Sequence, residues 1–283
     1  MVGAMARKQV KFRIDKLKIC YKQPPTLYKE VAPMQGKTID KGYFKLFVYE
    51  ADDQHAFANI VVGHQELGIL TLNNSKQCEG LCFFKFSNKA LYTDGCINQW
   101  ETIANTLGLA LNNITELEIA CDSSINIHAK VRKAIKHHEL YDMFVNGRKV
   151  HEYNRKIEGY LEHVPRSRQR MLYNLSTIYI SQKKQDGPVL RVYNKSEEIQ
   201  DNNHEKDYIV EDFKQIVYRT EIRLKSNSIK EFLKYYVSDE TSVLAMVLSE
   251  HFLSSAWSFF ADRLLFFRDK QGNDIAIADL LKM

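Results

Sequence analysis

Residues 216–226 read IVYRTEIRLKS, and their alternation decides the fold that we expect. Side chains two positions apart share one face of a β-strand. The charged residues of this stretch would therefore share a face: Arg219, Glu221, Arg223 and Lys225. A strand with one charged and one apolar face is typical of an antiparallel sheet that packs its apolar face on helices.

Two other stretches alternate in the same way. ITELEIACD (114–122) would place Glu116, Glu118 and Asp122 on one face, and VLRVYNK (189–195) would do the same for Arg191, Tyr193 and Lys195. Together the three strands predict a polar sheet face that carries carboxylates, cations and one tyrosine. The alternative is that Arg and Glu on an exposed face only form cross-strand pairs.

The fold expected from these patterns is α+β, with a central antiparallel sheet, helices on one face and an open polar face. We expect a β-rich N-terminal half over residues 1–112, a second half with the polar strands over 113–240, and a C-terminal helical segment over 241–283. Residues 127–147 are expected to form a basic amphipathic helix that ends near Gly147.

Composition excludes several classes of protein. The chain has 283 residues, of which 45% are hydrophobic and 27% charged, as in soluble globular proteins. Its longest apolar run, 243–267, carries four ionisable residues, so we expect no membrane span and a cytoplasmic location. Five cysteines without a CxxC pair predict free thiols rather than a disulfide framework or a zinc ribbon.

Positive charge is concentrated in one part of the chain. Residues 130–184 contain 13 Lys and Arg against 5 Asp and Glu, a local charge of +8 in a chain whose net charge is +5. Such a block is either a solvated helical face or a polyanion-binding surface. If the block binds a polyanion such as DNA, the cations that would contact its phosphates are Lys130, Arg132, Lys133, Arg166, Arg168 and Arg170.

The polar face also predicts a chemistry. Unpaired carboxylates are costly to bury, and Mg²⁺ and Mn²⁺ prefer carboxylate oxygens as ligands. A divalent cation beside a tyrosine and several arginines suits phosphoryl transfer, in which the phenol is the nucleophile and the cations neutralise the phosphate.

The residues at 191–198, RVYNKSEE, resemble the R-x-Y-[D/N]-K-x-x-E signature of the replication initiation factor (Rep_trans) family, the rolling-circle initiators of small plasmids. TELEIACD resembles the acidic strand of that family, and YRTEIRLK resembles its R-x-E-x-[E/R]-L-K strand. The matches cover roughly residues 114–226 and occur in the family's order.

The resemblance implies an HUH-nuclease-like fold and an enzyme that nicks and rejoins origin DNA at a single-stranded or hairpin site. Tyr193 would attack a phosphodiester, leaving a 5′-phosphotyrosyl link and a free 3′-OH. Arg191 and Lys195 would assist catalysis, and Arg219, Arg223 and Lys225 would contact DNA. The residues expected to hold the Mg²⁺ or Mn²⁺ are Glu118, Asp122, Glu221 and, as the weakest candidate, Glu198. The resemblance further implies a homodimer and a recruited host helicase.

Two departures and two alternatives accompany this interpretation. The wider class of such nucleases binds metal through a His-hydrophobe-His pair, which does not occur here, and Glu116 stands where the family often has arginine. Glu116 would be a further ligand or a partner of Arg219 or Arg223. The alternatives are a relaxase-like nickase of a conjugative element and a non-catalytic DNA-binding regulator.

Overall fold

The computed structural model describes residues 10–150, 177–181, 186–211, 213, 215–236 and 249–282. It is an α+β protein with a large antiparallel sheet. The chain divides into two units, one of Met1–Arg13 with Glu118–Met283 and the other of Ile14–Leu117. Strands β1 (Val10–Lys22) and β7 (Ala110–Ser123) contribute residues to both units.

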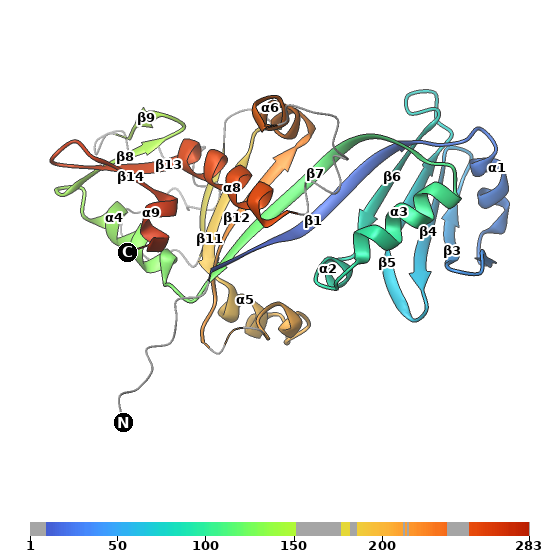
Figure 1. Cartoon of the computed structure of the whole chain (residues 1–283), viewed down its shortest axis with the longest axis horizontal. Coiled ribbons are helices and arrows are strands. Elements are labelled where there is room, and N and C mark those ends of the chain that lie inside the picture. Colours follow the sequence, from blue (N-terminus) through green and yellow to red (C-terminus); the bar gives the residue numbers. More distant parts are fainter. Residues whose placement is uncertain are drawn as a thin grey trace. The chain divides into compact units, whose positions relative to one another are not determined.

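In the first unit, β10 (Thr177–Ser181), β11 (Val189–Asn194) and β12 (Tyr218–Lys225) lie side by side, and β12 neighbours β7. Figure 1 labels β11, β12 and β7. The antiparallel register of β11 on β12 sets Arg191 opposite Glu221 and Tyr193 opposite Arg219. The three strands predicted to carry polar faces are therefore neighbours in one sheet.

Two helices cover the apolar side chains of this part of the sheet. Both α4 (Ile127–Lys136) and α8 (Glu250–Leu264) contact β11 and β12. Trp257 of α8 is fully buried, and its Nε1 donates a hydrogen bond of 3.1 Å to the carbonyl oxygen of Thr220. The other helices in the described part of this unit are α5 (Lys195–Asp201), η3 (Asp207–Ile209), α6 (Ser226–Tyr236) and α9 (Ile277–Lys282).

A second sheet in this unit corrects two predictions of helix. It contains β14 (Asp274–Ala276), β13 (Leu265–Asp269), β8 (Tyr141–Val145) and β9 (Arg148–Lys149). The basic helix ends at Lys136 with His137 as its C-cap, and the chain then forms the β8–β9 hairpin, whose turn is made by Asn146 and Gly147 with positive φ. The C-terminal segment is likewise not wholly helical, since the apolar run at 265–269 pairs with β8.

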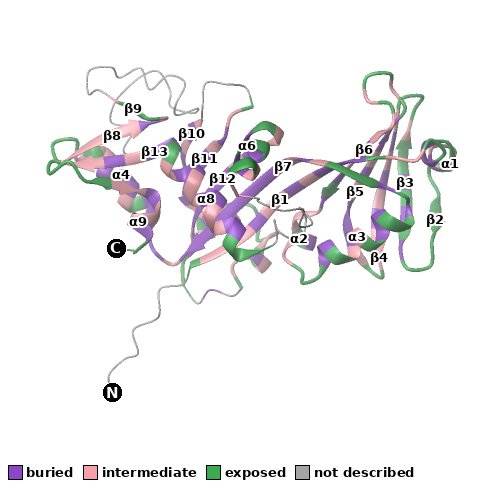
Figure 2. Ribbon diagram, turned by 45° about the horizontal axis from the view of Figure 1, so that its top comes forward, coloured by how far each residue is buried: buried purple, intermediate pink, exposed green. Residues whose placement is uncertain are grey.

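The second unit adds β6 (Leu81–Phe86), β5 (Gln65–Asn73), β4 (His55–Val62), β3 (Lys45–Ala51) and β2 (Thr38–Asp40), in that order after β7 and β1. Its helices are α1 (Leu27–Val31), η1 (Ala32–Met34), α2 (Asn88–Leu91) and α3 (Cys96–Thr106). Trp100 of α3 is fully buried, stacks on Phe84 and donates a hydrogen bond to the hydroxyl of Tyr21. Exposed and buried residues alternate along β3, as Figure 2 shows.

Gly68 of β5 is required by close packing against the neighbouring strand. A Cβ at this position would collide with the carbonyl oxygen of Lys85 and approach Cα of Phe86 at 2.9 Å. We expect Gly68→Ala to lower the free energy of unfolding by about 1–3 kcal/mol, because the backbone must shift to admit the methyl group. Chemical denaturation measures the loss, with Thr71→Ala on the same strand as control. Equal denaturation midpoints for the two variants would contradict this reason.

Asp262 of α8 predicts a pH dependence of stability. Burial raises the pKa of its carboxyl, although the backbone N–H groups of Ala278 and Ile277 donate to it and act in the opposite direction. Because the pKa of Asp262 is raised in the folded state, its protonated carboxyl favours the fold below the unfolded pKa. This contribution to the free energy of unfolding is lost as pH rises through the folded pKa. We therefore expect Asp262→Asn to stabilise the fold at neutral pH and to have little effect at about pH 4, measured as melting temperature against pH. An increase in melting temperature that is equal at both pH values would contradict this explanation.

Candidate active site on the polar sheet face

The site is built from polar side chains of β7, β11 and β12 in the first unit. The hydroxyl of Tyr193 donates a hydrogen bond of 3.1 Å to Oε2 of Glu221 on the adjacent strand. Both residues are buried, with Tyr193 8% and Glu221 1% exposed, so the expectation of an open polar face is wrong at the centre of the site. The register of β11 and β12 produces this contact, because both side chains lie on the face opposite the helices.

Arg191 joins two carboxylates. Its guanidinium contacts Oε1 of Glu221, and its Nη2 lies 3.3 Å from Oε2 of Glu118. Burial lowers the pKa of Arg191, but the charges of Glu221 and Glu118 outweigh burial and raise the pKa above its ordinary value. Glu118 also accepts a hydrogen bond of 2.5 Å from Nε of Arg223. The face therefore contains a connected network of two carboxylates, two guanidinium groups and one phenol.

Asp122 and Arg219 form a fully buried ion pair on the same face. Arg219 donates two hydrogen bonds, from Nε to Oδ1 at 2.6 Å and from Nη2 to Oδ2 at 2.8 Å. Neither side chain has any exposed surface. Arg219 is thus held against Asp122 and is not presented to solvent, although the resemblance places it at the DNA.

Lys195 and Glu198 lie on a helix and not on the strand, which corrects the predicted strand face. β11 ends at Asn194, whose side chain accepts a hydrogen bond from the N–H of Glu197 and caps α5. The Nζ of Lys195 lies 2.5 Å from Oε2 of Glu198 and 5.7 Å from the ring centroid of Tyr193. Lys195 therefore extends from the first turn of α5, and its ammonium group lies near the ring of Tyr193.

In the first unit, Glu118 and Glu221 could hold a metal ion. One oxygen of Glu118 lies within 4.8 Å of one oxygen of Glu221.

The other residues expected to contact DNA differ in how exposed they are. Arg223 and Lys225 of β12 are half-buried, as are Lys130 and Arg132 of α4, whereas Lys133 is exposed. The Nζ of Lys130 donates to the carbonyl oxygen of Leu280. Arg166, Arg168 and Arg170 lie outside the described residues. The Nζ of Lys16 lies 3.1 Å from Oε2 of Glu116.

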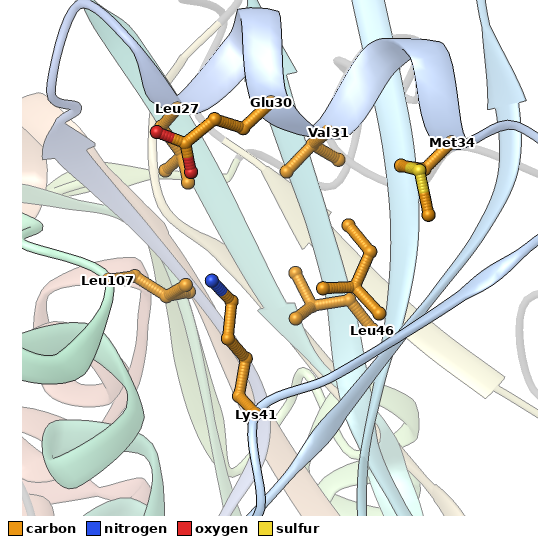
Figure 3. Close-up of a pocket in the computed structure, with 8 residues that line it drawn as sticks. Leu27, Glu30, Val31, Met34, Lys41, Leu46 and Leu107 are labelled. Atoms are coloured by element: carbon orange, nitrogen blue, oxygen red, sulfur yellow. The ribbon is translucent and has the colours of Figure 1, made fainter.

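A pocket of about 150 Å³ lies in the second unit, between the α1–η1 segment and the sheet (Figure 3). Its lining is mainly aliphatic and includes one carboxylate and one ammonium group, those of Glu30 and Lys41. Because two opposite single charges among aliphatic side chains supply neither a nucleophile nor a cluster of cations, this pocket does not suit phosphoryl transfer.

No protein-family model matches the chain, and no curated protein matches it significantly. Within the described ranges, no helix combines the length and the apolar character needed to cross a membrane.

Proposed function

We propose that this protein is a metal-dependent DNA strand transferase that initiates rolling-circle replication, with Tyr193 as nucleophile and an HUH-nuclease-like catalytic fold. The observation that carries the proposal is the hydrogen bond from the Tyr193 hydroxyl to Glu221, inside a network that also contains Arg191 and Glu118. A phenol beside a base and cations suits attack on a phosphodiester.

Each residue of the network has a role in this reaction. Glu221 accepts the phenolic proton as general base. The phenolic oxygen of Tyr193 forms a bond to phosphorus while the bond from phosphorus to the 3′ oxygen breaks, and the departing 3′ oxygen takes up a proton. Arg191 and Lys195 stabilise the negative charge that develops on the phosphate. The reverse reaction, with a 3′-OH as nucleophile, rejoins the strand and releases the tyrosine.

The carboxylates fit a hard divalent cation, because Mg²⁺ and Mn²⁺ prefer oxygen ligands. Glu118 and Glu221 would hold the ion, whose chemistry is to polarise the phosphate. All four oxygens of this pair already accept hydrogen bonds, from Arg223, Arg191 and Tyr193. The ion must therefore share these oxygens or displace Arg191.

The partners that we propose are single-stranded or hairpin origin DNA, a second copy of the chain and a host helicase, in the cytoplasm. The same chemistry would serve a relaxase-like nickase, which differs in the DNA that it recognises. A non-catalytic DNA-binding regulator would use the ion pairs only to stabilise the sheet, as the fully buried pair of Asp122 and Arg219 does.

The proposal is tested by incubating the full chain with supercoiled DNA of the replicon that encodes it, with Mn²⁺ or with EDTA. We expect nicked circles and a protein–DNA adduct that survives denaturing electrophoresis, both dependent on the metal. Binding without nicking in either condition would favour the regulator. Nicking confined to a transfer origin would favour the relaxase-like enzyme.

A further inference from the structure

The sheet of the second unit has one face that its helices do not cover, and aromatic rings lie along it. Phe47 and Tyr49 of β3 are 42% and 38% exposed, and Phe57 of β4 and Phe83 of β6 are half-buried. The rings of Tyr49 and Phe57 lie 6.1 Å apart between centroids. These residues alternate along their strands with fully buried side chains such as Val48, Ala58 and Phe84, so all four rings point away from the core.

Two lysines face each other across the strands of the same surface. Lys18 of β1 is directly opposite Lys85 of β6. Like charges in this position are destabilising, and among the described residues neither lysine forms an ion pair with a carboxylate. The Nζ of Lys18 lies 4.8 Å from the ring centroid of Phe83. An anion bound between the two lysines would remove their repulsion.

The rings and the lysines of this face lie in two neighbouring rows that cross the strands. One row runs through Phe47, Asn59, Ile69, Lys85 and Lys18 on successive strands. The next runs through Phe57, Thr71 and Phe83. Since adjacent strands lie about 4.8 Å apart, a chain that crosses the strands along the first row would pass the ring of Phe47 and then the ammonium groups of Lys85 and Lys18.

We propose that this open face, defined by Phe47, Tyr49, Phe57, Phe83, Lys18 and Lys85, binds single-stranded nucleic acid. Exposed rings on a sheet stack unpaired bases, and lysines contact the phosphates between them. A duplex keeps its bases stacked inside and would leave the rings unused. A purely apolar protein partner would leave two facing lysines buried without an anion. The proposal goes beyond strand transfer and does not require Tyr193 to be the nucleophile.

Fluorescence anisotropy with the full chain and a labelled oligothymidylate of about 12 nucleotides tests the proposal. We expect Phe83→Ala and the double variant Phe47→Ala/Tyr49→Ala each to weaken binding by about tenfold or more, because each loses base stacking. The double variant Lys18→Gln/Lys85→Gln should weaken binding and reduce the salt dependence of log K by about 1.4, for two phosphate contacts.

The matched control is Lys29→Gln/Lys89→Gln, which removes two exposed lysines from α1 and α2 and so makes the same change in net charge. It should bind as tightly as the wild type, and circular dichroism should show every variant folded. The proposal is overturned if the wild type prefers duplex or does not bind the oligonucleotide at low salt. It is also overturned if the folded Phe83→Ala and Lys18→Gln/Lys85→Gln variants bind as tightly as the wild type. The binding assay contains no metal and no cleavable origin, so failure of nicking leaves its result unchanged.

Discussion

Tyr193→Phe is expected to abolish both nicking and the covalent adduct, with a fall in rate of roughly 10⁴-fold or more, because no other group replaces a lost nucleophile. Phenylalanine retains the ring beside Lys195 and removes only the hydroxyl that contacts Glu221. Arg191 still neutralises Glu221. We therefore expect the fold to lose only about 1 kcal/mol, the net value of one hydrogen bond.

The matched control is Tyr218→Phe on β12. Tyr218 is opposite Asn194 in the register and lies on the same strand as Glu221. Tyr218→Phe also removes one tyrosine hydroxyl, but from a position next to the site, and we expect this variant to nick DNA at the wild-type rate. The measurement is the fraction of nicked circles with time, with the adduct followed by radiolabelled DNA. Undiminished nicking by Tyr193→Phe would refute its assignment as the nucleophile.

Asp122→Asn is expected to lower the free energy of unfolding by about 3–5 kcal/mol, because it removes one charge of a buried pair and leaves the other without compensation. Both members of the pair are fully buried, and Arg219 makes two hydrogen bonds to the carboxylate. A loss of this size is a large share of the stability of an ordinary domain. Denaturant unfolding followed by tryptophan fluorescence measures it, since Trp257 contacts the adjacent Thr220.

The chain offers a control with the same geometry in solvent. Arg268 donates two hydrogen bonds to Asp274, at 2.6 and 3.1 Å, and both side chains are exposed. Asp274→Asn should leave the denaturation midpoint nearly unchanged, because water and salt screen an exposed pair. Replacing both buried partners, as Asp122→Leu with Arg219→Met, should recover much of the lost stability. Equal effects of Asp122→Asn and Asp274→Asn would show that burial is not the reason.

Strand periodicity was a good guide to the polar face and a poor guide to where elements end. Arg191, Tyr193 and Glu221 do share a face, because a period of two holds along any paired strand. The same rule predicted that Lys195 lies on the strand. The strand instead ends at Asn194, whose side chain caps helix α5. The helix prediction at 127–147 failed for a related reason, since a turn at Asn146 and Gly147 separates two short strands.

Local sequence was enough to determine which residues would carry charge on the same strand face, because that property depends on the backbone of one strand. It could not pair those charges. Asp122 lies 97 positions from Arg219, and Glu118 lies 73 from Arg191. Whether a carboxylate contacts a guanidinium, a phenol or a metal depends on which strands become neighbours and on how deeply each side chain is buried. These contacts form only when β7, β11 and β12 come together. They pair Asp122 with Arg219 and join Glu118 to Glu221 through Arg191.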